Sequence, residues 1–375
     1  MTLAIDMIGT HLGSGTRTYN LSFCEYLSEN NINENIYVFI TKDYLKDINF
    51  DKNPNIKFKI KSSIYTNIFF RIFWMQFFFP FELKKLKVDQ LFSPMNMSPL
   101  ILKLFKIKLT LALHSNLPWV YFNMMPGNLI RNIFTKYLMQ LSIYLCDKLI
   151  VDSEFAKNEI LEILNLKQKK VYVVYLGIDK KYLLSNDNLK FVKNFDYNNY
   201  VISVLSCVKY HNIINLLKAF KLYKDETKSK IKLIFVMQIL DKDYFKEINL
   251  FITQNSLNND IIFFHNLDSD FLVNLYKRAK LYVFTSYCEV FGLTSLEAMS
   301  QGCPVLISSK SALPEVNGRA AHYFDPDDIQ KIYKSMKMIL QDNDYKEKLV
   351  TEGDIHFRKF NWNTTVKQTL EVLNT

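Results

Sequence analysis

Residues Leu281 to Leu306 read LYVFTSYCEVFGLTSLEAMSQGCPVL, and this stretch decides the fold class of the chain. It opens with an apolar run, 281–284, that suits a buried strand. Apolar residues at helical spacing then predict a helix that begins near Gly292 or Leu293. The apolar run 304–307 predicts a second strand. A strand, a loop, a helix and a strand are the repeating unit of a parallel α/β sheet.

Two glutamates, Glu289 and Glu297, stand eight residues apart in this stretch. Ligands of parallel sheets bind at the carboxyl ends of the strands, where Glu289 is expected. Backbone N–H groups at a helix start carry partial positive charge and can receive a phosphate. Here these groups belong to Phe291, Gly292, Leu293 and Thr294. Glu297, more than one turn into the helix, is placed to bind a ribose, and Glu289 is placed on the sugar side.

These positions predict a nucleotide-sugar site, since a pyrophosphate between a ribose and a sugar is a nucleotide-sugar. The alternative is that both glutamates are solvated surface charges. The stretch resembles the Glu-x7-Glu motif of retaining GT-B glycosyltransferases of glycosyltransferase family 4, also called group 1. Residues Ser311–Val316 and Phe324–Asp328 resemble that family's next two motif blocks. The resemblance implies that Glu289 contacts the transferred sugar and that Glu297 binds the ribose.

The fold that the resemblance implies is the GT-B form of the α/β class, with two facing Rossmann-like domains and the active site in the cleft between them. We expect an N-terminal, acceptor-side domain over 1–182 and a C-terminal nucleotide-sugar-binding domain over 183–360. A final helix at about 361–375 is expected to cross back to the first domain. The Asn- and Lys-rich segment 180–199 is the expected linker.

Two further positions in the first half match the family. Gly15 lies in a Gly-x-Gly loop that follows the first predicted strand, and such a loop can bring backbone N–H groups to an anion. It resembles the family loop that approaches the donor phosphate and the acceptor. His114 follows a predicted strand, 108–113. A single histidine there is more often structural, but this position matches the family histidine that contacts the donor sugar.

The block Ser206–Asn212 is where the chain departs from its family. The family has a glycine, an arginine and a lysine there, and the basic residues bind the donor pyrophosphate and stabilise the leaving group. Leu205, Ser206 and His211 occupy those positions here. We expect Lys209 to act in place of the missing pair, with His211 also at the donor. The alternatives are a non-catalytic GT-B-like partner of another transferase, which binds a nucleotide-sugar, and a nucleotide-sugar epimerase.

The charge and the cysteine content narrow the choice of partners. The net charge of +10 is spread along the chain, which argues against a nucleic-acid tail and suits an anionic donor or membrane surface. Five cysteines without Cys-x-x-Cys spacing fit a reducing compartment. There is no Asp-x-Asp motif and no His/Cys cluster with metal-ligand spacing, so we expect neither a metal nor a cofactor.

The most apolar stretch, 64–87, holds seven phenylalanines. Arg71 and Gln76 interrupt it and Pro80 follows them, so it does not read as a transmembrane helix. We expect a buried amphipathic helix of the first domain. The alternative is a membrane-surface helix whose aromatic face enters the headgroups beside the following lysines. Those lysines are Lys84, Lys85 and Lys87.

The resemblance therefore implies a retaining, metal-independent transferase that moves a sugar from a nucleotide-sugar to a saccharide or lipid-linked saccharide. Bacterial surface polysaccharide synthesis, of O-antigen, capsule or exopolysaccharide, is the expected setting. The N-terminus has no basic region followed by an apolar core, so we expect no signal peptide. A cytoplasmic protein, peripheral on the inner face of the plasma membrane, is the expected form.

Overall fold

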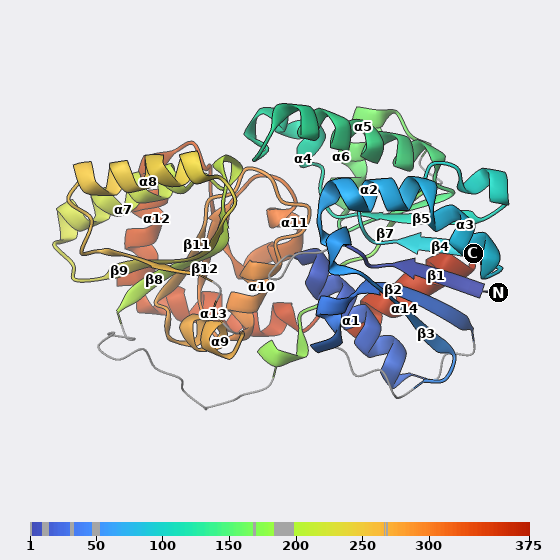
Figure 1. Cartoon of the computed structure of the whole chain (residues 1–375). Coiled ribbons are helices and arrows are strands. Elements are labelled where there is room, and N and C mark those ends of the chain that lie inside the picture. The colour runs from blue at the N-terminus through green and yellow to red at the C-terminus, as the bar shows by residue number, and fades with distance from the viewer. Residues whose placement is uncertain are drawn as a thin grey trace. The chain divides into compact units, whose positions relative to one another are not determined.

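The computed structural model describes residues 2–9, 15–30, 34–46, 53–167, 170–183, 199–265, 267 and 269–375. They form two compact units, each built on its own parallel sheet (Figure 1). The first unit comprises Met1–Asn116, Ile133–Gly177 and Asn361–Thr375. The second comprises Leu117–Asn132 and Ile178–Phe360. Most of the expected linker, 184–198, lies outside the described residues, as do Gly13 and Ser14 of the Gly-x-Gly loop.

The first unit holds a seven-stranded sheet in the order β3-β2-β1-β4-β5-β6-β7. The strands are β1 (Thr2–Asp6), β2 (Asn35–Thr41), β3 (Ile56–Lys61), β4 (Gln90–Ser93), β5 (Lys108–Leu113), β6 (Lys148–Val151) and β7 (Val171–Val173). Every pairing is parallel; Ile5, for example, lies opposite both Val38 and Phe92. Inner strands of a parallel sheet are covered on both faces, which explains apolar runs such as that of β2, whereas the edge strand β3 alternates apolar residues with lysines.

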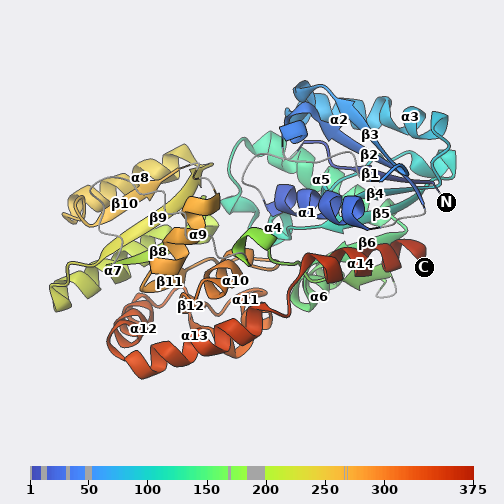
Figure 2. The same ribbon diagram turned by 90° about the horizontal axis from the view of Figure 1, so that it is seen from below.

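Helices cover both faces of this sheet. They are α1 (Gly15–Glu29), α2 (Ile68–Phe77), α3 (Phe79–Lys85), α5 (Leu129–Leu145), α6 (Glu154–Leu164) and α14 (Trp362–Asn374). Short helical turns of this unit are η1 (Lys42–Lys46), η2 (Ser63–Thr66) and η3 (Leu102–Phe105). The short turns α4 (Leu117–Val120), η4 (Phe122–Met124) and η6 (Lys180–Tyr182) belong to the second unit. Helices α2, α3 and α5 lie on one face and α1 with α14 on the other (Figures 1 and 2). Tyr19 of α1 packs on Trp362 of α14, with ring centroids 5.5 Å apart.

The second unit holds a six-stranded parallel sheet in the order β10-β9-β8-β11-β12-β13. Its strands are β8 (Tyr200–Cys207), β9 (Lys232–Ile239), β10 (Ile261–Phe264), β11 (Leu281–Phe284), β12 (Val305–Ser308) and β13 (His322–Phe324). Its helices are α7 (Ile213–Thr227), α8 (Lys242–Gln254), α9 (Ser269–Arg278), α10 (Leu293–Ser300), α11 (Leu313–Asn317), α12 (Ile329–Gln341) and α13 (Asn343–Phe357), with the turns η7 (Lys209–His211) and η8 (Gly318–Ala320). The predicted unit of strand, loop, helix and strand is confirmed as β11, α10 and β12, with Val283 opposite Leu306.

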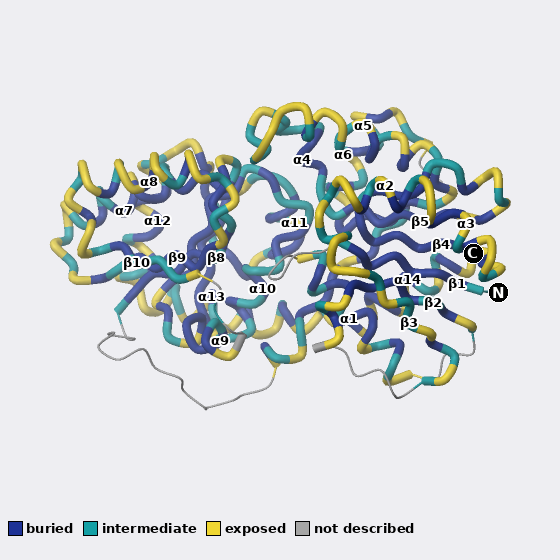
Figure 3. Tube along the Cα trace, viewed as in Figure 1, coloured by how far each residue is buried: buried dark blue, intermediate teal, exposed yellow. Residues whose placement is uncertain are grey.

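The stretch 64–87 differs from the expected single buried helix. It forms two helices, α2 and α3, that meet at Phe78, because Pro80 has no N–H and fits only the first turn of a new helix. One side is buried, at Trp74 and Met75, but most of the phenylalanines are exposed. The prediction of a buried helix is therefore wrong for this aromatic side. Figure 3 shows the general pattern: strands are buried, and helices carry exposed outer turns.

Candidate active site

The start of α10 has the geometry that the sequence predicts. The helix begins at Leu293, and Gly292 before it has a φ of +94°, in the left-handed region. A Cβ atom at Gly292 would lie 2.6 Å from Cδ2 of Leu313, so both conformation and space require glycine. The first turn of a helix leaves N–H groups without intrahelical partners, which makes this end suited to an anion.

The side chains of this first turn have structural partners. Phe291 is buried and packs edge-on against Phe360, with ring centroids 5.6 Å apart, so any ligand contact from Phe291 would come from its backbone. The Thr294 hydroxyl lies 2.7 Å from the hydroxyl of Tyr282 on β11. The strand that precedes the site and the helix that follows it are thus joined directly.

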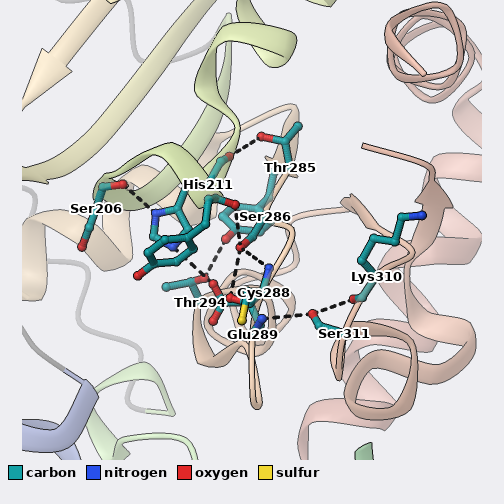
Figure 4. Close-up of polar contacts among 11 residues, drawn as sticks. Ser206, His211, Thr285, Ser286, Cys288, Glu289, Thr294, Lys310 and Ser311 are labelled. Atoms are coloured by element: carbon teal, nitrogen blue, oxygen red, sulfur yellow. Dashed lines mark hydrogen bonds and ion pairs between the residues drawn. The ribbon is translucent and has the colours of Figure 1, made fainter. Parts of the chain in front are cut away.

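Glu289 and His211 form a pair at the carboxyl ends of β11 and β8 (Figure 4). His211 Nε2 lies 3.3 Å from Glu289 Oε1, and His211 Nδ1 lies 2.6 Å from the carbonyl oxygen of Ser206. A carbonyl oxygen only accepts hydrogen bonds, so Nδ1 carries a hydrogen. A second proton on Nε2 would then give an imidazolium that donates to both oxygens.

The loop that carries Glu289 is held on two sides. The Glu289 N–H donates to Oγ of Ser311 at 3.0 Å, and the Ala312 N–H donates to the Glu289 carbonyl at 3.1 Å. On the other side, Oγ1 of Thr285 donates to the His211 carbonyl at 2.8 Å. The buried hydroxyl of Ser286 reaches the Tyr210 carbonyl at 3.4 Å. In the sequence, Thr285 and Ser286 mark only the end of a strand, because the carbonyls of His211 and Tyr210 that they reach lie more than seventy positions away.

Glu297 lies on α10 as predicted, in an environment that the sequence did not reveal. Tyr276 donates a hydrogen bond to its Oε2 at 3.2 Å. Burial raises the pKa of Glu297 to about 7, although the charge of Lys181 and hydrogen bonds from Tyr182 and Tyr276 favour the ionised form. Near neutral pH this carboxyl group is therefore shared between its protonated and ionised forms.

Lys209 and Ser206 occupy different surroundings from His211. Lys209 is exposed on η7, and its charge contributes, after that of Lys246, to lowering the pKa of Asp243 on α8. Ser206 is the seventh residue of β8. Of the residues in the altered block, the structure brings His211 into contact with Glu289.

His114 belongs to the first unit and follows β5 directly, as predicted. Its Nδ1 lies 2.9 and 3.0 Å from the two carboxylate oxygens of Asp152, which follows β6. The ring also lies against Tyr19, with centroids 4.8 Å apart. Its Nε2 is buried and has no hydrogen-bond partner within the described part of the chain.

The partner of His114, Asp152, directly precedes the residue that caps α6. Ser153 is the cap of α6, since its Oγ accepts from the Ala156 N–H at 3.1 Å. Asp152 does not cap the helix, and its carboxylate instead binds and orients His114. Gly15 is the first residue of α1, and a Cβ atom there would meet no heavy atom within 4 Å. Space alone does not require glycine at this position.

Comparison with known families assigns the chain. The model of glycosyl transferases group 1 matches residues 185–355, and the model of glycosyltransferase family 4 matches residues 13–182. The chain belongs to this family of glycosyltransferases. In the ranges that the structure describes, no group of three or more His, Cys, Asp and Glu side chains could hold a metal ion.

Two curated relatives of this glycosyltransferase carry O-antigen names. The O-antigen chain mannosyltransferase RfbU of Salmonella typhimurium is 25% identical over 232 residues, which are 62% of this chain and 61% of that protein. O-antigen chain mannosyltransferase B of Escherichia coli is 27% identical over 223 residues, 58% of each chain. The chain thus spans about three fifths of the length of these relatives.

Solved structures show the fold. Anabaena Alr3699/HepE in complex with UDP-glucose superimposes with a TM-score of 0.75 at 16% identity, covering 100% of this chain and 99% of that one. Sucrose-phosphate synthase from Thermosynechococcus elongatus gives the same TM-score and identity over 100% and 98%. The two parallel sheets and these likenesses identify the GT-B fold.

Proposed function

We propose that this glycosyltransferase moves a sugar from a nucleotide-sugar to a saccharide or lipid-linked saccharide during the synthesis of a bacterial surface polysaccharide. The observation that carries the proposal is the placement of Glu289 and Glu297 on either side of the start of α10, with His211 against Glu289. The names of the relatives, O-antigen chain mannosyltransferases, support O-antigen as the product and mannose as a candidate sugar.

Each residue has a proposed role toward the donor. The start of α10 binds the pyrophosphate, Glu297 accepts hydrogen bonds from the ribose, and Glu289 contacts the sugar. Lys209 and a protonated His211 offset the negative charge of the leaving phosphate without a metal. His114, held by Asp152, is proposed to contact the sugar from the first unit.

The proposed reaction retains the configuration at the anomeric carbon. The acceptor oxygen forms a bond to that carbon on the face from which the phosphate leaves, and the bond between the carbon and the phosphate oxygen breaks. The acceptor proton passes to the leaving phosphate, so the products are a glycoside and a nucleoside diphosphate. Within this scheme the protein orients the two substrates and stabilises the charge that develops on the phosphate.

A donor screen with the purified protein tests the proposal. Nucleotide-activated mannose and glucose are incubated with saccharide and lipid-linked acceptors, and mass spectrometry detects the glycoside and the released nucleotide. Nuclear magnetic resonance of the product then reports the anomeric configuration, and addition of a chelator tests the absence of a metal requirement. Inversion of configuration, or loss of turnover with the chelator, would contradict the mechanism.

The altered block, Ser206–Asn212, favours a second candidate function. In this case the chain would bind a nucleotide-sugar without catalysis, as the partner of another transferase. Ser206 and His211 stand where the family has its basic pair, so the positive charge at the leaving group is reduced. Calorimetric binding of a nucleotide without turnover of any donor would support this candidate. Conversion of the donor in the absence of an acceptor would instead indicate an epimerase.

A further inference from the structure

Helix α2 presents an aromatic face to solvent. Phe69, Phe70, Phe73 and Phe77 recur at positions i, i+1, i+4 and i+8, which places them on one face of the helix. They are 51–69% exposed, and Phe78 at the junction with α3 is 56% exposed. The rings of Phe73 and Phe77 lie 5.1 Å apart, so these side chains form a cluster. An exposed apolar cluster of this kind marks an interaction surface.

Helix α5 repeats this pattern. Ile133, Phe134, Tyr137 and Leu141 recur at the same four positions, i, i+1, i+4 and i+8, and each is exposed. The opposite side of α5 is also apolar and lies in the core, at Leu138, Met139 and Ile143. The buried side alone accounts for the packing of the helix on the sheet. The apolar residues on its outer side therefore need another explanation.

Both helices lie on the same face of the sheet and are held by one segment (Figures 1 and 2). Gln76 of α2 donates a hydrogen bond to the Ser98 carbonyl at 3.1 Å. The Ser98 N–H donates to Oγ of Ser142 on α5 at 3.1 Å. Because Ser98 bonds to both helices, α2 and α5 are neighbours on this face of the sheet, and we treat their exposed apolar residues as one surface. We name this surface the aromatic face.

The charges around the aromatic face are almost all positive. Apart from Arg71, which is buried against Asp6, helices α2, α3 and α5 contain four basic residues, Lys84, Lys85, Arg131 and Lys136, and one acidic residue, Glu82. The Glu82 carboxylate is already bound by Lys61 at 2.7 Å. Beside α3, the turn η3 adds exposed Lys103 and the most exposed large apolar residue described, Leu104, at 80%.

We infer that the aromatic face docks on an anionic membrane surface. Helices that lie in the plane of the lipid headgroups are typically rich in aromatic residues flanked by lysines. Their rings enter the apolar boundary of the bilayer, and their lysines bind anionic lipids. No described helix is both long and apolar enough to cross a membrane. The inference concerns attachment and holds whichever sugar is transferred.

Flotation of the full chain with vesicles tests this inference without any catalytic readout. We expect the protein to float with mixed phosphatidylcholine and phosphatidylglycerol vesicles at low salt, and much less with phosphatidylcholine alone or at high salt. The triple variant Phe69→Ser/Phe73→Ser/Phe77→Ser should lose at least about tenfold in partitioning at any salt concentration. The triple variant Lys84→Gln/Lys85→Gln/Lys87→Gln should lose about as much at low salt only, because its effect is electrostatic.

Matched controls separate the aromatic face from exposed apolar residues in general. Leu250→Ser/Ile355→Ser removes two residues of similar exposure from the second unit and should leave flotation unchanged. A variant on the other helix, Phe134→Ser/Tyr137→Ser, should weaken flotation, and circular dichroism confirms that each variant is folded. Absence of wild-type flotation at low salt, or wild-type behaviour of both aromatic variants, overturns the inference. Sedimentation that shows a dimer abolished by Phe69→Ser/Phe73→Ser/Phe77→Ser also overturns it and assigns the face to a second copy.

Discussion

His211 Nε2 lies 3.3 Å from Glu289 Oε1 while Nδ1 of the same ring is held by the Ser206 carbonyl. The ring therefore has one fixed hydrogen-bond partner in the backbone and one in the carboxylate assigned to the sugar. A lysine, which the family has at this position, offers donors only and carries a permanent charge. The histidine ring, in contrast, can both donate and accept a hydrogen bond.

Substitutions can show how much Lys209 and His211 each contribute to stabilising the leaving phosphate. Lys209→Ala should lower turnover on the order of 10²-fold, since it removes a positive charge that offsets the leaving phosphate. His211→Lys should preserve or raise turnover, because it restores the family's residue. Steady-state kinetics of both variants check this prediction. Full turnover of Lys209→Ala together with inactivity of His211→Ala would show that the histidine stabilises the leaving group and that Lys209 does not.

Glu297 should control nucleotide affinity. Glu297→Ala removes charge-assisted hydrogen bonds to the ribose, with an expected loss of about 1.5–3 kcal/mol. Because burial raises the pKa of Glu297 to about 7, affinity of the wild type should fall as the pH is lowered through neutrality, whereas Glu297→Gln should show no such fall. Isothermal titration calorimetry with the nucleoside diphosphate measures both effects. Equal affinity of wild type and Glu297→Ala would remove this residue from the site.

Ionisation of Glu297 should lower the stability of the fold, although it favours nucleotide binding. Its pKa in the folded chain, about 7, lies above the value of 4.5 that applies when it is exposed. Its contribution is therefore full below pH 4.5 and lost as the pH rises through about 7. Glu297→Gln, which does not ionise, should be more stable than wild type by about 1–3 kcal/mol near pH 8 and by little near pH 5. Urea denaturation at the two pH values provides the measurement, and a gain independent of pH would contradict the assignment.

His114 should act on the sugar, with Asp152 as its positioning residue. His114→Ala should cut turnover and leave the affinity for the bare nucleoside diphosphate nearly intact. Asp152→Asn should lower turnover and shift its pH profile, because the amide no longer fixes the imidazole as the carboxylate does. Ser153→Ala is the matched control: it removes the cap of α6, costs about 0.5–2 kcal/mol of stability and leaves the pH profile unchanged. Equal loss of nucleotide affinity in His114→Ala would refute the role at the sugar.

Gly292→Ala should destabilise the site for two separable reasons. The left-handed φ costs about 1–2 kcal/mol for a residue with a Cβ atom, and that atom clashes with Leu313. The double variant Gly292→Ala/Leu313→Ala relieves the clash but keeps the backbone strain. It should therefore recover only part of the nucleotide affinity that Gly292→Ala loses. Thermal unfolding and calorimetry on both variants report the two contributions. Wild-type affinity in Gly292→Ala would show that the phosphate does not depend on this turn.

The sequence was sufficient where the chemistry is local. The run 281–284, the helix start at Leu293 and the strand end before His114 follow from periodicity and from residues with special backbone needs. The surroundings of Glu297 were not predictable, because Tyr182 and Tyr276 come from distant elements. The exposure of the phenylalanines on α2 was hidden for a different reason. Arg71, the charged residue of this helix, is buried against Asp6 while the phenylalanines are exposed, so polarity does not mark the exposed side of the helix.

The position of α5 in the chain has a consequence for the direction from which an acceptor arrives. This helix connects β5 to β6, so the same crossover that carries part of the aromatic face joins the strands that end at His114 and Asp152. A crossover helix runs alongside the strands that it connects. If α5 lies flat on a bilayer, β5 and β6 also run parallel to the membrane plane. Their carboxyl ends then point along the membrane surface. A lipid-anchored acceptor would then reach His114 by lateral diffusion in two dimensions, without leaving the membrane.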